Sequence, residues 1–178
     1  MNTWIGPALI AAVISSLVTA VGWLVNYRSS LGLEKERRLE KVRDFQIALR
    51  AEIRSELHQL DTENLIDELK VIEGRYDKSK TYAVFVPSLA RHVVFESLIR
   101  EIHLLPESVI DPVILYSRQR QMIDQFASDL RSERYLKLSQ TRQLEMYRDY
   151  VSFMVHLKKL ATDASGAIEL SLQKEKPQ

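Results

Sequence analysis

Histidine has the widest chemical use of the side chains in this sequence, since imidazole serves both acid–base chemistry and metal binding near neutral pH. The four histidines are His58, His92, His103 and His156. None of them has a second histidine four residues away, and no glutamate precedes one by three residues. These spacings place paired metal ligands on one helix face, as in zinc and di-metal bundle sites. The sequence therefore predicts no metal site.

One row of polar residues could still do chemistry. His92, Glu96, Arg100 and His103 follow one another along one face of a predicted helix. They could form a metal or acid–base cluster, or they could simply be solvated side chains on an exposed helix face. We favour the solvated face.

Other kinds of site are excluded by composition and motif. The chain has no cysteine, so disulfides, thiolate chemistry and cysteine zinc sites are ruled out. It contains neither a glycine-rich phosphate loop nor a Gly-x-Ser-x-Gly nucleophile elbow. With 25 basic against 24 acidic residues, bulk binding to nucleic acid is not expected. We predict no enzyme activity, no catalytic or cofactor-binding residues, no cofactor and no small-molecule substrate.

The N-terminal stretch is the strongest structural signal. Residues 1–27 carry no charged side chain, and the run from Trp4 to Val25 is almost wholly apolar or small. About 20 such residues suffice to cross a bilayer as a helix. Aromatic residues suited to the membrane interfaces lie near both ends, and a proline lies in the first turn. These predicted span residues are Trp4, Pro7, Trp23 and Tyr27. A cleaved secretory signal is the alternative, but its basic start is missing.

Basic residues follow the predicted span and set its predicted orientation. They are Arg28, Lys35, Arg37, Arg38, Lys41 and Arg43. The positive-inside rule then predicts a single-pass protein of the inner (cytoplasmic) membrane, with its C-terminal domain in the cytoplasm and the lipid bilayer as one partner.

Small residues recur every four positions in the same stretch, at Ala8, Ala12, Ser16 and Ala20. This spacing makes a shallow groove on one face of a helix, which suits close packing against a second copy and predicts a homodimer. Ser16 could add an interhelical hydrogen bond. Two alternatives stay open: the residues may be ordinary fillers, or Ala11, Ser15 and Thr19 may form a competing stripe.

The rest of the chain is predicted to be all-α. Apolar residues at steps of three or four make one stripe through Leu39, Val42, Phe45, Leu49, Ile53, Leu57 and Leu60. The stripe suits a coiled coil or the core of a bundle, and we favour an antiparallel bundle because later segments carry matching stripes. The predicted organisation is a transmembrane anchor (1–27), a charged amphipathic juxtamembrane helix (28–60), a helical bundle domain (61–165) that packs on 39–60, and a C-terminal tail (166–178). Whether 33–75 forms one helix or two is left open.

Two runs resemble a known kind of protein: VRDFQIALRAEIRSEL, and VVFESLIREIHLLPESVIDPVILYSRQRQMI. Their most specific element is Val94-Phe95, followed by Leu104-Leu105-Pro106 and then Tyr116. They are similar to small bacterial single-pass membrane proteins that have an N-terminal span, a charged helix and a helical cytoplasmic region. The resemblance implies no activity.

The predicted function is a membrane-tethered helical interaction or regulatory module with an unidentified protein partner. One alternative is a phage-lysis-type envelope protein with its helical rod on the far side of the membrane. Another is a membrane-bound enzyme whose site is assembled only in three dimensions.

Overall fold

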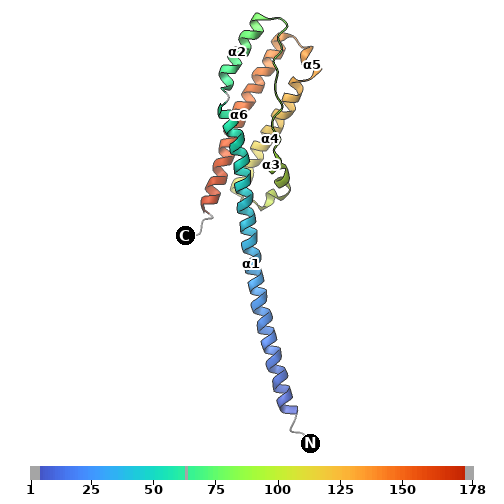
Figure 1. Cartoon of the computed structure of the whole chain (residues 1–178), viewed down its shortest axis with the longest axis vertical. Helices are drawn as coiled ribbons and strands as arrows, with labels where there is room; N and C mark the ends of the chain where they lie inside the picture. Colours follow the sequence, from blue (N-terminus) through green and yellow to red (C-terminus); the bar gives the residue numbers. More distant parts are fainter. Residues whose placement is uncertain (1–4, 63, 175–178) are drawn as a thin grey trace. The chain divides into compact units, whose positions relative to one another are not determined.

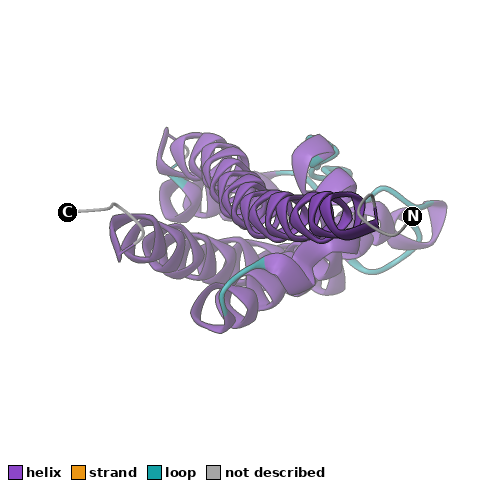
Figure 2. Ribbon diagram, turned by 90° about the horizontal axis from the view of Figure 1, so that it is seen from below, coloured by secondary structure: helices purple, strands orange, loops and turns teal. Residues whose placement is uncertain are grey.

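The computed structural model describes the backbone of residues 5–62 and 64–174, and the side chains of that part except residues 5–11, 13 and 62. The described residues form helices and loops with no strand, so the predicted all-α class is confirmed (Figure 2). The helices are α1 (Ile5–Thr62), α2 (Leu65–Lys78), α3 (Val93–Leu98), the 3-10 helix η1 (Ile99–Leu104), α4 (Glu107–Leu130), α5 (Glu133–Leu136) and α6 (Gln140–Lys174) (Figure 1).

The chain divides into two compact units, Met1–Arg43 and Asp44–Gln178. The first unit contains the N-terminal part of α1. From Ala12 to Lys41, every side chain that the structure describes is exposed. The second unit contains the last turns of α1 and all the other helices.

The prediction of a transmembrane helix needs correction. Among the described residues, none of the helices combines the length and the apolar character that crossing a membrane needs. The described side chains of α1 place the hydroxyl groups of Ser15, Ser16 and Thr19 among the apolar residues, and Asn26 and Arg28 follow. The predicted single-pass inner-membrane localisation with a cytoplasmic C-terminal domain is therefore wrong.

The core of the second unit forms where the predicted stripes meet. In α1, Phe45, Leu49, Ile53 and Leu60 are buried, as their spacing predicts. The predicted apolar faces of α4 and α6 are also confirmed. Their buried members are Val113, Tyr116, Ile123, Leu130, Tyr147, Val151, Met154, Leu157 and Ala161. Helix α4 packs along α6, and α2 packs on α6 as well, so α6 is the central element of this unit (Figure 1).

Helix ends follow local chemistry in most places. The question left open for 33–75 is answered by two helices, α1 and α2, with Asn64 immediately before α2. Helix α4 begins at Glu107, directly after Pro106, whose fixed φ suits a helix start. Helix α4 continues through Pro112. Helix α6 continues to Lys174, and Ile168 within it is fully buried.

Residues 79–92, between α2 and α3, contain no helix or strand, and we call this segment the strap. The next helix, α3, begins only at Val93. Side chains of the strap alternate sharply: Val84 and Val86 are buried, but Phe85 between them is 82% exposed. This alternation is typical of extended chain, in which successive side chains point to opposite sides.

Candidate functional site

Two glutamates one helical turn apart on α1 form the centre of a buried charged cluster. Glu52 and Glu56 flank Ile53 on the apolar stripe, so the helix that buries the stripe also carries both carboxylates into the interior. Their side chains are only 14% and 11% exposed. Charged groups that are this buried are normally paired, because desolvation of an isolated charge is expensive.

Glu56 contacts three side chains from two other parts of the chain. Arg120 Nε on α4 donates to Glu56 Oε1 at 3.0 Å. Tyr116 on the same helix donates its hydroxyl proton to Glu56 Oε2. His92, at the end of the strap, places Nε2 3.3 Å from the same oxygen. We call Glu52, Glu56, His92, Tyr116 and Arg120 the carboxylate cluster.

The hydrogen bonds determine which nitrogen of His92 carries a proton. Tyr116 has a single hydroxyl proton, and that proton goes to Glu56. His92 Nε2 lies 3.3 Å from the Tyr116 oxygen and 3.3 Å from the Glu56 oxygen, so a lone pair there would face two other oxygens. Nε2 is therefore the protonated nitrogen, and His92 acts as a donor.

Glu52 caps a helix that is distant in the sequence. Its two carboxylate oxygens accept from the backbone N–H groups of Val94 at 2.9 Å and Phe95 at 2.8 Å, in the first turn of α3. The N-cap residue of α3 is His92, which makes no side-chain capping bond of its own. Glu52 thus satisfies two N–H groups that a helix start leaves without partners, and its negative charge suits that end of the helix.

Burial and pairing act against each other at Glu56. Desolvation by burial raises the pKa of the Glu56 carboxyl, but hydrogen bonds from His92 and Tyr116, together with the electrostatic attraction of His92 and Arg120, outweigh it. The net result is a pKa below the ordinary value for glutamate. The same burial, and the nearby charge of Glu56, raise the pKa of Tyr116 far above its usual range. Glu56 is therefore a carboxylate and Tyr116 a neutral donor at neutral pH.

A second buried polar network contains no charge. The hydroxyls of Tyr76 and Tyr135 lie 3.1 Å apart, and Gln143 Oε1 lies 3.4 Å from the Tyr76 hydroxyl. Gln143 Nε2 donates to the backbone carbonyls of Tyr135, Leu136 and Leu138 at 3.1 to 3.3 Å. The strap joins this network through the N–H of Val84, which donates to the Tyr76 hydroxyl at 3.3 Å. We call Tyr76, Tyr135 and Gln143 the neutral network.

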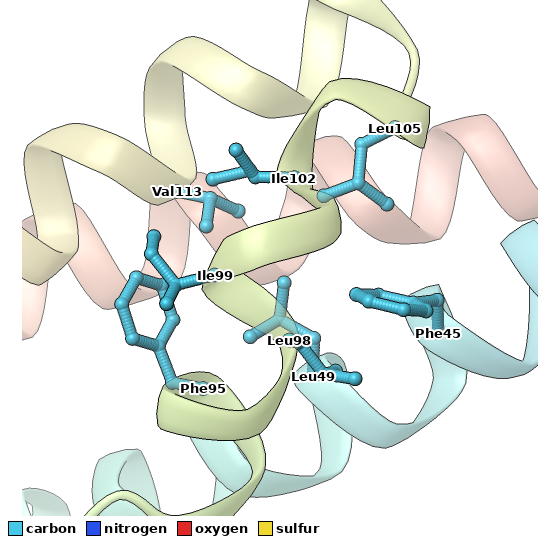
Figure 3. A pocket seen from close by; sticks show the side chains of 8 residues that line it. All are labelled: Phe45, Leu49, Phe95, Leu98, Ile99, Ile102, Leu105 and Val113. Carbon is cyan, nitrogen blue, oxygen red and sulfur yellow. The ribbon is translucent and has the colours of Figure 1, made fainter.

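Two cavities border the strap. One of about 100 Å³ is lined by Glu56, Gln59, Leu60, residues 87–90, Tyr150 and Met154. The other, of about 90 Å³, is lined by Leu65, Glu68, residues 85–87, Tyr147, Tyr150, Val151 and Met154. A third hollow under α3 and η1 is wholly apolar, as Figure 3 shows, and holds only about 10 Å³. That volume is near the lower limit for one water molecule, so it is a packing gap.

The polar row predicted on one helix face does not assemble. His92 lies in the carboxylate cluster, whereas Glu96 pairs with exposed Arg91 at 2.7 Å, and Arg100 and His103 lie on η1. Among the residues that the structure describes, no group of three or more histidine and acidic side chains is arranged to hold a metal ion. The solvated interpretation fits Glu96 but not His92, which is buried.

The residues singled out near the N-terminus are exposed where they are described. Trp23 and Tyr27 stack on each other with their rings 5.5 Å apart, and the six basic residues from Arg28 to Arg43 are exposed. Ser16 donates its hydroxyl to the Ala12 carbonyl at 2.8 Å within the same helix, so its proton is already used there. Trp4 and the side chains of Pro7 and Ala8 lie outside the described residues.

Sequence reasoning missed the carboxylate cluster almost entirely. The available signal was the pair Glu52 and Glu56, which occupies the edge of an apolar stripe rather than the opposite face. Arg120 and His92 gave no such signal, because their partner is more than 30 residues away in sequence. Comparisons of this chain with protein-family models, with curated proteins and with solved structures found no match.

Proposed function

We propose that this chain is a helical protein-interaction module with no catalytic activity of its own, and that its partner is a second copy of the chain. The observation that carries the proposal is the apolar surface of the first unit. Large apolar side chains there are 47 to 69% exposed. They include Ile14, Leu17, Val18, Val21, Trp23, Leu24 and Val25. A contiguous apolar surface of this kind marks a contact site, because water solvates it poorly.

The shape of this surface suits close approach of another helix. Ser15, Ser16, Thr19, Ala20 and Trp23 line an open hollow on α1. Four small side chains and one aromatic ring leave room for a facing side chain, as a hole receives a knob in paired helices. Because the Ser16 hydroxyl is bonded within its own helix, contact through the hollow rests on packing.

Charge favours a second copy as the occupant. Beyond the apolar surface, residues 34–41 carry Glu34, Glu36 and Glu40 among four basic side chains, and all of them are exposed. A surface that interleaves both signs can pair with another copy of itself, as charged flanking positions do in paired helices. A partner of one sign would be repelled by part of the same surface. Symmetric dimers are also the commonest protein assemblies.

The buried polar clusters support a non-catalytic role. In the carboxylate cluster, Glu52 holds the start of α3, and Glu56 holds His92 and Arg120. Both carboxylates are thus engaged in joining parts of the fold, whereas a general base needs a proton of the substrate within hydrogen-bond reach.

The test is the mass of the full chain in solution, measured by sedimentation equilibrium over a range of concentrations. We expect a dimer that dissociates on dilution. Val21→Lys should weaken it by placing a charge in the apolar contact, whereas Ile66→Lys, at an equally exposed position on α2, should leave it unchanged. A monomer at every concentration would overturn the proposal. So would a chain that is monomeric alone and is taken up by lipid vesicles through the same surface.

A further inference from the structure

The strap has little hydrogen bonding of its own. Within residues 79–92, the described backbone donates two internal hydrogen bonds, from Tyr82 N to Ser79 O and from Thr81 N to Ser79 Oγ, each at 3.4 Å. Helices and sheets satisfy their backbone groups internally, but this segment depends on contacts to other parts of the chain. Its position is therefore decided by a few hydrogen-bonded anchors and by Val84 and Val86, which pack in the core.

Those anchors lie at the two ends of the strap. At the first end, Gln140 Nε2 donates to Ser79 O at 2.8 Å, and the Val84 N–H donates to Tyr76 of the neutral network. At the second end, Arg120 donates to the carbonyl of Ala90, and Glu56 bonds His92. Glu52 then holds the first turn of α3, directly after the strap.

Between the anchors, the strap covers α6 without filling the space beneath it. The cavities of about 100 and 90 Å³ share Pro87 of the strap and Tyr150 and Met154 of α6. Protein interiors are close-packed, and voids larger than a water molecule are few. The two pockets are partly open to solvent and leave unfilled space beside Pro87, although Val84 and Val86 just before it are buried in the core. Low contact density and few internal hydrogen bonds are the marks of a segment that opens locally.

We propose that the strap is a cover that opens and closes over α6 as a unit while the helices stay folded, and that the carboxylate cluster is its latch. The charged and titratable groups that face the latch are Glu52 and Glu56 on α1, Tyr116 and Arg120 on α4, and His92 and Glu96 at the strap end and in α3. When the strap leaves, His92 and the Ala90 carbonyl leave with it. Opening uncovers the apolar floor formed by Tyr147, Tyr150 and Met154.

The experiment uses the full chain, which has no cysteine, so that a single introduced thiol reports exposure at one position. Val86→Cys places it under the strap, where Val86 is 1% exposed, and Ala161→Cys places it in the core of α6, where Ala161 is fully buried. Each variant is treated with excess iodoacetamide in native buffer, and labelling is followed by mass spectrometry. We expect Val86→Cys to react about tenfold faster or more, because local opening requires less free energy than global unfolding.

Two further substitutions test whether the strap opens as a unit and whether the carboxylate cluster is its latch. Ile168→Val, in the core of α6, should accelerate labelling of Ala161→Cys by roughly two- to tenfold, because it destabilises the folded chain. The labelling rate of Val86→Cys should stay unchanged, because the substitution destabilises the closed and open forms of the strap equally. Glu56→Gln should accelerate labelling of Val86→Cys by about tenfold or more, since the hydrogen bond from His92 to this charged group exists in the closed form alone. The bonds from Tyr116 and Arg120 belong to both forms. His92→Phe, which removes the donor at the end of the strap itself, serves the same purpose should Glu56→Gln fail to fold.

Three results would overturn the proposal. Equal labelling of the two cysteines would show that the strap opens only when the chain unfolds. The same conclusion follows if Ile168→Val accelerates both equally. Unchanged labelling of Val86→Cys in the Glu56→Gln and His92→Phe backgrounds would remove the carboxylate cluster as the latch.

Discussion

The two ends of the strap are fastened by different chemistry. At one end, the neutral network of Tyr76, Tyr135 and Gln143 uses hydroxyls, an amide and backbone carbonyls. At the other end, the carboxylate cluster uses two carboxylates, a guanidinium and an imidazole. Both are buried, and both join segments that are far apart in sequence.

The two clusters satisfy their buried polar groups in different ways. The neutral network needs only the right number of donors and acceptors. The carboxylate cluster needs that and a balance of charge, because each ion has been taken out of water. Glu52 meets the requirement with the N–H groups of α3, and Glu56 meets it with Arg120. The charged end should therefore be more sensitive to loss of one member and to pH.

The largest effect is expected from Arg120→Met. The substitution keeps much of the side chain's length but leaves the buried Glu56 carboxylate without its guanidinium, at a cost of about 3–5 kcal/mol. The measurement is urea unfolding of the full chain at neutral pH. The matched control is Arg148→Met, because Arg148 pairs with Glu73 at 2.7 Å but is half exposed. That pair should contribute at most about 1 kcal/mol. Similar losses of unfolding free energy for the two variants would mean that burial does not make the Arg120 pair stronger than the Arg148 pair.

A smaller effect is expected from Gln143→Leu, which tests the neutral end. The leucine has nearly the same shape but removes the amide that donates to the carbonyls of Leu136 and Leu138 and accepts from Tyr76. Leaving buried groups without partners costs about 1–3 kcal/mol. The loss in free energy of unfolding should be the same at pH 5 and pH 8, since none of these groups changes charge there. A loss of unfolding free energy as large as that of Arg120→Met would show that the charged end is no more sensitive than the neutral end.

The smallest effect is expected in the free energy of unfolding at acid pH. The reason is that burial of Glu56 partly offsets the pairing that lowers its pKa. A carboxyl with a lowered pKa in the folded state stabilises the fold fully above the ordinary glutamate pKa of about 4.3, and this contribution is lost as the pH falls through the folded value. The difference in free energy of unfolding between the parent chain and Glu56→Gln should therefore narrow as the pH is lowered below that range. A constant difference down to pH 2.5 would contradict the shift.

Much of the fold was predictable from local pattern. The spacing of Leu49, Ile53 and Leu60 placed the buried face of this part of α1 correctly, and the later helices bury one apolar face each, as the matching stripes predict. These predictions succeeded because one buried face per helix imposes a period of 3.6 residues on the sequence. The predicted membrane span failed because its evidence was a count of apolar residues, whereas the described stretch places hydroxyl side chains among them, and Asn26 and Arg28 follow.

The candidate site was far less predictable. The hydrogen bond from Tyr116 to Glu56 joins residues 60 positions apart. The sequence predicts His92 and Glu96 on one helix face, whereas the helix begins only at Val93. No local pattern reports a partner on another helix.

The amino-acid sequence by itself determined the helical class of this protein, the buried faces of its long helices and the absence of thiol chemistry. These properties follow from periodicity and composition, which act within a few turns of one helix. Only the tertiary structure decided that Glu52 caps α3, that Glu56 meets Arg120 and His92, and that the strap lies over α6. The physical reason is that a buried charge must find its partner in space, and packing of the helices brings that partner from a distant part of the chain.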